Sequence, residues 1–294
     1  MNRVLKISIL IIMPALIAGM IIFSLKNSEL EKLNFNQSKQ TINISVTESL
    51  FYSSLNSPEE NNSFDYHTKG SILPHHDLAG EMMADYFSNL KNSQEVKTFI
   101  IIGPNHQDVG LAPVITADVS WNTPMGELQN NSAVQSLVHE SYVSNDYQNI
   151  VSEHSVQVLM PYISNYFPQA DVIPLAINSK LTKQEAHDLG LRLASLIDDR
   201  TVLINSLDFS HYLPSDQTAM KDAETELLIR NKEFDQLWTL GNDHIDSPYS
   251  LLVFLYCMEE LNSYEVEVLD HRNSAHFLGD RVEISTSYLT INFH

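Results

Sequence analysis

Cysteine is almost absent from this chain of 294 residues, since Cys257 is the only one. An internal disulfide is therefore excluded, and so is a cysteine cluster that could hold an iron–sulfur centre. Cys257 lies in the apolar run LLVFLYCM, where we expect it to pack as a small hydrophobic residue. Positive charge is also scarce, because 17 lysines and arginines stand against 37 aspartates and glutamates, for a formal net charge of −20. Such a surface repels phosphate backbones, so we expect no nucleic-acid partner.

Acidic residues are missing altogether from the first 26 positions. Arg3 and Lys6 precede an uncharged run over residues 7–25, which Lys26 ends. As a helix this run would be about 28 Å long, close to the ~30 Å hydrocarbon core of a bilayer. We therefore predict a transmembrane helix that anchors the protein over residues 1–26, with a cleavable signal peptide as the alternative. The positive residues before the run predict a membrane-anchored protein whose remaining chain is extracytoplasmic.

Sustained hydrophobic periodicity begins only near Gly70. Residues 27–69 are polar and rich in Asn, Ser and Glu, which predicts a polar stalk with one edge strand over 41–46. Over residues 70–294 short apolar runs alternate with amphipathic stretches, which favours one α/β domain with a mostly parallel central sheet flanked by helices. The expected strands are 71–73, 96–102, 171–177, 201–204, 266–269 and 282–291, and the expected helices are 78–90, 153–167, 182–197, 216–230, 233–240 and 248–262.

Chemically active side chains follow three of the expected strands. His75 comes after the first, His106 after the second, and both Asp208 and His211 follow residues 201–204. Because the carboxyl ends of parallel strands meet at one edge of a sheet, we expect these groups to lie together. Imidazole nitrogens and a carboxylate oxygen suit Fe(II) or Zn(II). A single histidine is more often a surface residue than a ligand, but three at equivalent strand ends favour a metal site.

Four motifs carry a family resemblance, and they read PHHDLAG, GPNHQDVG, EHSVQVLMPYI and SLDFSHYLP in chain order. Their order and rough spacing resemble the Memo family, also called AmmeMemoRadiSam system protein B. That family is similar in fold to class III extradiol ring-cleaving dioxygenases, and the resemblance covers the chain from about Gly70 to the carboxyl terminus. It implies a single α/β domain with a metal-capable pocket at one edge of the sheet.

The resemblance also implies which residues hold the metal. His75 and His106 stand at the histidines that bind iron or copper in family members. The family often has a cysteine ligand before the last large helix, where this chain has Asp246. Two histidines with one carboxylate form the set associated with non-haem Fe(II), and a carboxylate resists the oxidation that threatens a thiolate outside the cytoplasm. Asp246 is explained equally well as the N-cap of the following helix.

Four more residues acquire roles from the resemblance. His211 corresponds to a histidine that acts as a general acid–base in the related dioxygenases, so we expect it to carry protons. Asp208 is then the group that fixes its tautomer. Glu153 and His154 match a Glu–His pair that we expect to support the ligands from behind, with helix capping as the alternative.

Three functions are compatible with this pattern. The first is a metal-dependent oxidoreductase with Fe(II), or else Cu, held by His75, His106 and Asp246. The second is a non-catalytic module that binds a small molecule or peptide in the same cleft. The third is a zinc hydrolase, because two histidines, a carboxylate and a water also make an open zinc site.

Overall fold

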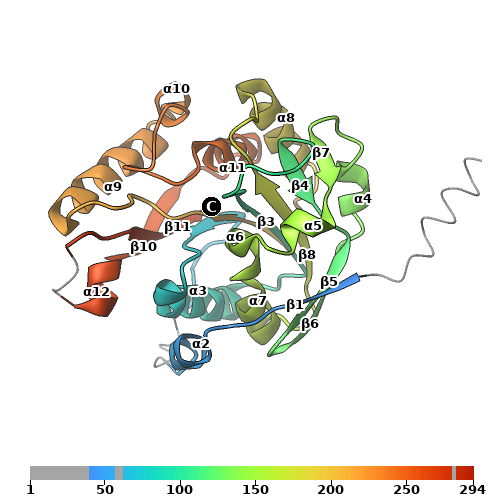
Figure 1. The fold of residues 1–294 in the computed structure, drawn as a ribbon, viewed down its shortest axis with the longest axis horizontal. Coiled ribbons are helices and arrows are strands. Elements are labelled where there is room, and N and C mark those ends of the chain that lie inside the picture. The colour runs from blue at the N-terminus through green and yellow to red at the C-terminus, as the bar shows by residue number, and fades with distance from the viewer. Residues whose placement is uncertain (1–39, 57–61, 280–282) are drawn as a thin grey trace, which may run out of the picture. The chain divides into compact units, whose positions relative to one another are not determined.

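Five parallel strands form the centre of the sheet, in the order β6 (Gly126–Asn130), β8 (Asp171–Ile177), β3 (Thr98–Pro104), β9 (Thr201–Ser206) and β2 (Gly70–Leu73) (Figure 1). The computed structural model describes residues 40–56, 62–279 and 283–294, and in this part of the chain the sheet has 11 strands. The antiparallel pair β11 (Ser287–Phe293) and β10 (Val266–Asn273) extends it beyond β2. The predicted α/β class and mostly parallel sheet are confirmed.

Both faces of the sheet are covered by helices. On β3, Ile100 and Ile102 belong to one core, which α8 (Lys183–Ala194) and α11 (Pro248–Glu260) cover. The alternate residues Phe99 and Ile101 belong to the other core, under α3 (Gly80–Ser93) and α7 (Met160–Tyr166). Two covered faces explain why the central strands are continuous apolar runs rather than alternating ones.

Most of the long helices lie where hydrophobic periodicity predicts them. α8 starts with the predicted capping box, in which Thr182 and Glu185 each satisfy the other's backbone N–H. α9 (Ser215–Arg230) and α11 follow the predicted ranges closely, and α10 (Phe234–Leu237) is shorter than predicted. The short helix η1 (Asp77–Ala79) leads into α3.

The predicted helix over 153–167 is two helices instead. α6 (His154–Gln157) ends before Pro161, which lies in the first turn of α7. Proline has no N–H to donate to the carbonyl of Gln157, and its ring clashes with that carbonyl, so one continuous helix cannot form. The break leaves α6 as a separate turn that carries Glu153 and His154.

Residues 107–152 form short elements that periodicity does not reveal. They include α4 (Val134–Leu137), α5 (Tyr147–Ile150) and strands of three to five residues. Such lengths are too short to show a helical or strand period. The strands are β4 (Val114–Thr116), which pairs with β8, β5 (Val119–Thr123), which pairs with β6, and β7 (Val143–Asn145), which pairs with β4.

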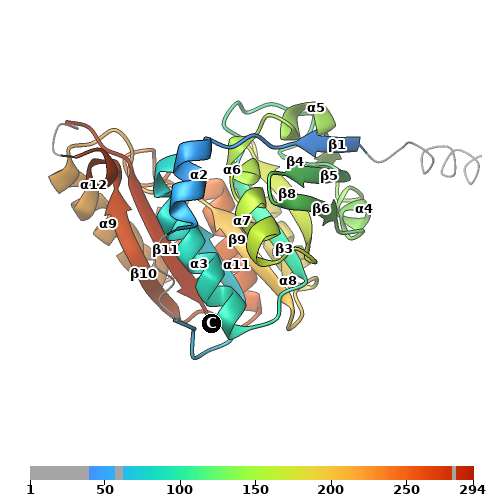
Figure 2. The same cartoon turned by 90° about the horizontal axis from the view of Figure 1, so that it is seen from below.

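The compact unit of the described chain starts at Thr41, before the expected domain start at Gly70. β1 (Gln40–Asn43) lies next to β5, and α2 (Glu48–Ser54) packs beside α3 (Figure 2). Ile42, Ile44 and Phe51 are buried in the core that α3 and α7 cover. Three apolar side chains within ten residues are thus enough to pack part of the stretch that we expected to form a polar stalk.

The predicted membrane anchor over residues 1–26 lies outside the described residues. Across residues 40–56, 62–279 and 283–294, no helix has both the length and the apolar character needed to cross a membrane. The apolar helix α11 has 13 residues, about 20 Å, which is well short of the ~30 Å hydrocarbon core. The predicted localisation as a membrane-anchored protein with an extracytoplasmic domain is therefore corrected and is not retained.

Candidate metal centre

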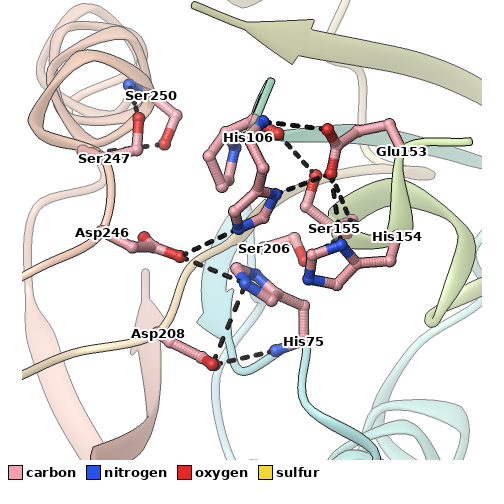
Figure 3. Close-up of polar contacts among 11 residues, drawn as sticks. His75, His106, Glu153, His154, Ser155, Ser206, Asp208, Asp246, Ser247 and Ser250 are labelled. Carbon is pink, nitrogen blue, oxygen red and sulfur yellow. Dashed lines mark hydrogen bonds and ion pairs between the residues drawn. The ribbon is translucent and has the colours of Figure 1, made fainter. Parts of the chain in front are cut away.

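Three parallel strands end at the same edge of the sheet and deliver the predicted site residues. His75, His106 and Asp208 each lie two residues beyond the last residue of β2, β3 and β9, respectively. β9 lies between the other two strands and pairs with both in parallel. The three side chains therefore line one cleft of about 650 Å³, which Figure 3 shows from within.

Three imidazoles meet in this cleft, because His154 joins His75 and His106. His154 is the first residue of α6, and its ring centroid lies 5.2 Å from that of His75 and 4.2 Å from that of His106. One nitrogen of each ring lies within 4.8 Å of the other two, so the three could hold a metal ion. Burial, followed by repulsion from His75 and His106, lowers the pKa of His154 to about 4. His154 is thus neutral at pH 7 and has a nitrogen lone pair to offer.

Glu153 fixes the orientation of His106. The Nδ1 atom of His106 lies 2.8 Å from Oε1 of Glu153, and the backbone N–H of His106 donates to Oε2 at 3.0 Å. Burial alone would raise the pKa of the Glu153 carboxyl, but the hydrogen bonds from His106 and from the backbone N–H of Ser155 lower it below its usual value. Since an ionised carboxylate only accepts, Nδ1 carries a proton, so Nε2 is the nitrogen with the lone pair in the neutral imidazole. Glu153 is also the N-cap of α6, so the two expected roles coincide.

His75 lies in the opposite environment, buried between two carboxylates. Its Nε2 atom is 3.1 Å from Oδ2 of Asp246 and 3.8 Å from Oδ2 of Asp208, and its backbone N–H donates to Oδ1 of Asp208 at 3.0 Å. Burial lowers the pKa of His75, but attraction to Asp208 and Asp246 outweighs it, and the pKa is raised to about 9. Without a metal, His75 therefore carries a proton at pH 7, which a metal ion must replace.

Asp246 lines the cleft and is not the N-cap of α11. The N-cap of α11 is Ser247, whose side chain accepts from the backbone N–H of Ser250 at 3.1 Å. Both carboxylate oxygens of Asp246 are buried and accept no aligned hydrogen bond from the described residues. Oδ2 lies 3.1 Å from Nε2 of His75 and 3.9 Å from Nε2 of His106. A buried carboxylate beside two imidazoles is an arrangement that a cation stabilises.

The donor atoms fit a transition metal, and their spacing distinguishes two candidates for the third ligand. Two nitrogens bound to zinc at ~2.1 Å in a tetrahedral arrangement lie roughly 3.4 Å apart. Oδ2 of Asp246 lies 3.1 Å from Nε2 of His75 and 3.9 Å from Nε2 of His106, and the three imidazole nitrogens lie within 4.8 Å of one another. Imidazoles with one carboxylate suit Fe, Cu and Zn.

His211 and Asp208 do not form the expected pair. His211 lines the cleft, and its backbone N–H donates to the carbonyl of Asn242 at 2.9 Å, but its buried Nδ1 atom has no hydrogen-bond partner among the described residues. Asp208 contacts His75 instead, through the hydrogen bond and the ion pair given above. Asp208 is therefore placed to hold His75, while His211 stands alone at the wall of the cleft.

Comparison with known proteins agrees with this architecture. The family model of Memo-like proteins matches residues 36–292. The chain is similar to the MEMO1 family protein PAE0818 of Pyrobaculum aerophilum, with 27% identity over 240 residues, which are 76% of this chain and 83% of that protein. It is also similar to the MEMO1 family protein MK0963 of Methanopyrus kandleri, with 31% identity over 160 residues, 52% of this chain and 56% of that protein.

A solved structure gives a likeness of fold alone. The crystal structure of the uncharacterized protein JW3007 from Escherichia coli K12 has a TM-score of 0.51 and 10% sequence identity, and the match covers 76% of this chain and 99% of that one. The family match, by contrast, spans most of the sequence and includes the three strand ends and α6. On that match, the chain belongs to the Memo family.

Proposed function

We propose that this protein is a metal-dependent oxidoreductase that acts on a small molecule in the cleft. His75 and His106 hold the metal, and His154 or Asp246 completes the set. The observation that carries the proposal is the meeting of three imidazoles beside the buried carboxylate of Asp246. When bound there, iron or copper supplies one-electron and oxygen chemistry that no amino-acid side chain provides.

The chain's own residues have separate tasks in this proposal. Glu153 keeps the proton of His106 on Nδ1, so that Nε2 faces the metal. Asp208 fixes the loop after β2 through the backbone N–H of His75. His211 lines the cleft with an unpaired Nδ1 atom, and we assign to it the transfer of protons to and from the bound molecule.

A zinc hydrolase is the second candidate, and one observation favours it. Three imidazoles with an open fourth position form a known type of catalytic zinc site, and His154 supplies the third imidazole here. Metal identity separates this candidate from the oxidoreductase, because zinc has no redox chemistry.

The test is elemental analysis of the full chain purified without oxygen. We expect close to one iron or copper per chain and loss of that metal in His106→Ala, because His106 offers the one ring held ready by Glu153. His139→Ala is the control, since His139 is exposed and lies outside the cluster. Zinc in place of iron or copper would favour the hydrolase. Failure to take up any metal, even on reconstitution, would leave the cleft as a binding site for a small molecule or peptide.

Oxygen uptake extends the test from binding to turnover. We expect the iron- or copper-loaded chain to consume oxygen with a catechol or another phenol, and His211→Ala to retain the metal while losing most of this activity. Loss of metal from His211→Ala would contradict the assignment of this residue to proton transfer.

A further inference from the structure

A second, smaller cavity adjoins the metal centre at His154. Its volume is about 190 Å³, and we call it the side pocket. His154 is the residue that lines both the side pocket and the cleft. Its apolar walls come from the segment before α2, from α2 itself and from α6–α7, namely Ile44, Val46, Phe51, Val158, Pro161 and Tyr162. Polar side chains also line it, namely Ser45, Thr47, Asp77 and Gln157.

The walls of the side pocket are held in place by packing and hydrogen bonds. Phe51 and Tyr162 make an edge-to-face contact with ring centroids 5.1 Å apart, and the hydroxyls of Tyr162 and Ser54 lie 3.2 Å apart. The backbone N–H of Ile44 donates to the carbonyl of Asn122 at 2.8 Å, which ties the segment before α2 to β5. A pocket with fixed walls loses little free energy to ordering when a ligand enters.

The size of the side pocket allows one ring. An engineered apolar cavity of about 150 Å³ holds a benzene molecule, and the side pocket is slightly larger at about 190 Å³. Sites for complete small ligands are larger, roughly 300–1,000 Å³. The cleft, at about 650 Å³, falls in that range. The side pocket is thus large enough for one group of a molecule whose remainder lies in the cleft.

The charge of the side pocket favours some substituents on a bound ring over others. Asp77 is the one carboxylate among the lining residues, and no lysine or arginine lines the pocket in the described chain. Oδ2 of Asp77 accepts a hydrogen bond from the hydroxyl of Thr47 at 2.6 Å, which fixes the carboxylate at the pocket. A carboxylate or phosphate on the ring would be repelled, whereas an ammonium or a hydroxyl could donate to Asp77.

We propose that the side pocket is a specificity subsite that takes a ring-sized apolar group, neutral or positively charged, of a molecule bound in the cleft. That this molecule is the substrate of the metal centre rests on the proposed function. The binding of the ring does not, because no metal ligand other than His154 lines the pocket.

Ligand-detected NMR on the full chain, without metal and after metal loading, tests the proposal with three matched probes. We expect benzylamine and benzyl alcohol to bind and benzoate to bind about fivefold more weakly, because its carboxylate meets the exposed carboxylate of Asp77. In Asp77→Asn we expect this discrimination against benzoate to shrink. Benzoate binding as tightly as benzylamine to the unaltered chain would overturn the charge selectivity.

Filling the pocket supplies the second arm. Val158→Phe should weaken benzylamine binding by about tenfold or more, and Val46→Phe should do the same from the opposite chain segment. Val138→Phe is the matched control, because Val138 is also a partly buried C-cap residue, at the end of α4, and does not line the pocket. Unchanged benzylamine binding in both filled variants would overturn the subsite. Val158→Phe and Val46→Phe should still bind metal. If the unaltered chain binds benzylamine but takes up no metal, the proposed function is refuted and the subsite is not.

Discussion

His75 and His106 occupy equivalent positions at the ends of parallel strands, yet different side chains surround them. Each lies two residues beyond the end of a parallel strand and faces the same cleft. The side chain of His106 is 32% exposed, its Nδ1 atom lies 2.8 Å from Oε1 of Glu153, and its Nε2 atom lies 3.9 Å from Oδ2 of Asp246. The side chain of His75 is 3% exposed, and its Nε2 atom lies beside Asp208 and Asp246. Glu153 fixes the tautomer of His106, whereas Asp208 and Asp246 hold a proton on His75.

The difference shows that strand topology places a residue but its neighbours decide its chemistry. A carboxylate on Nδ1 fixes the tautomer of the ring and makes Nε2 a more basic ligand. Two carboxylates beside Nε2 stabilise the imidazolium, which is the form that cannot bind a metal. Metal affinity should therefore depend on the proton of His75 far more than on that of His154, whose pKa is lowered to about 4.

The largest expected effect is the pH dependence of metal affinity. Since the pKa of His75 is about 9, metal must displace its proton at every lower pH. We expect affinity to rise about tenfold per pH unit between pH 7 and pH 9, roughly a hundredfold in all, and to level off above. Competition against a chelator of known pH dependence measures this. In Asp208→Asn the plateau should begin at a lower pH, because one of the two charges that raise the pKa is gone. An affinity independent of pH would contradict the protonated His75.

A smaller effect should come from removing the support of His106. Glu153→Gln replaces an acceptor-only carboxylate with an amide, which no longer dictates which nitrogen of His106 carries the proton. We expect metal affinity at pH 9 to fall about 10–100-fold. The pH at which affinity levels off should stay where it is, because His75 is unaltered. In Asp208→Asn, by contrast, the pH at which metal affinity levels off should fall. An equal shift of that pH in both variants would show that His75 and His106 do not act independently.

The convergence of His75, His106 and Asp208 could be predicted because it needs only three strands and their direction. The states of Asp246 and His154 could not. Ser247 rather than Asp246 caps α11, a choice between neighbouring residues that both make good caps. His154 reaches the cleft because Pro161 separates α6 from α7, a break that the continuous apolar stripe from Val156 to Phe167 conceals. Local competition of this kind is settled by tertiary contacts rather than by spacing.

The segment around α2 shows the same limit. Its few apolar residues do not form a period long enough to predict packing, although Ile44 and Phe51 are buried. The side pocket depends on this segment and on α7 together, so no single stretch of sequence reveals it. The anchor prediction concerned residues 1–26, which lie outside the described residues, and the described residues contain no helix able to cross a membrane.

The smallest expected effect comes from a carboxylate–imidazole pair away from the metal centre. The Nε2 atom of His271 on β10 lies 2.8 Å from Oδ2 of the buried Asp222 on α9. The hydrogen bond to Asp222 raises the pKa of His271 against the opposing effect of burial. A raised pKa means that the stabilisation is complete below the ordinary value near 6.5 and is lost as the pH rises through the folded-state value.

His271→Gln should therefore lower the free energy of unfolding by about 1 kcal/mol at pH 6 and by less at pH 9. The effect is small because the histidine is partly exposed. Urea titrations at the two pH values measure this change. Metal uptake by His271→Gln should equal that of the unaltered chain, because His271 lies away from the metal centre.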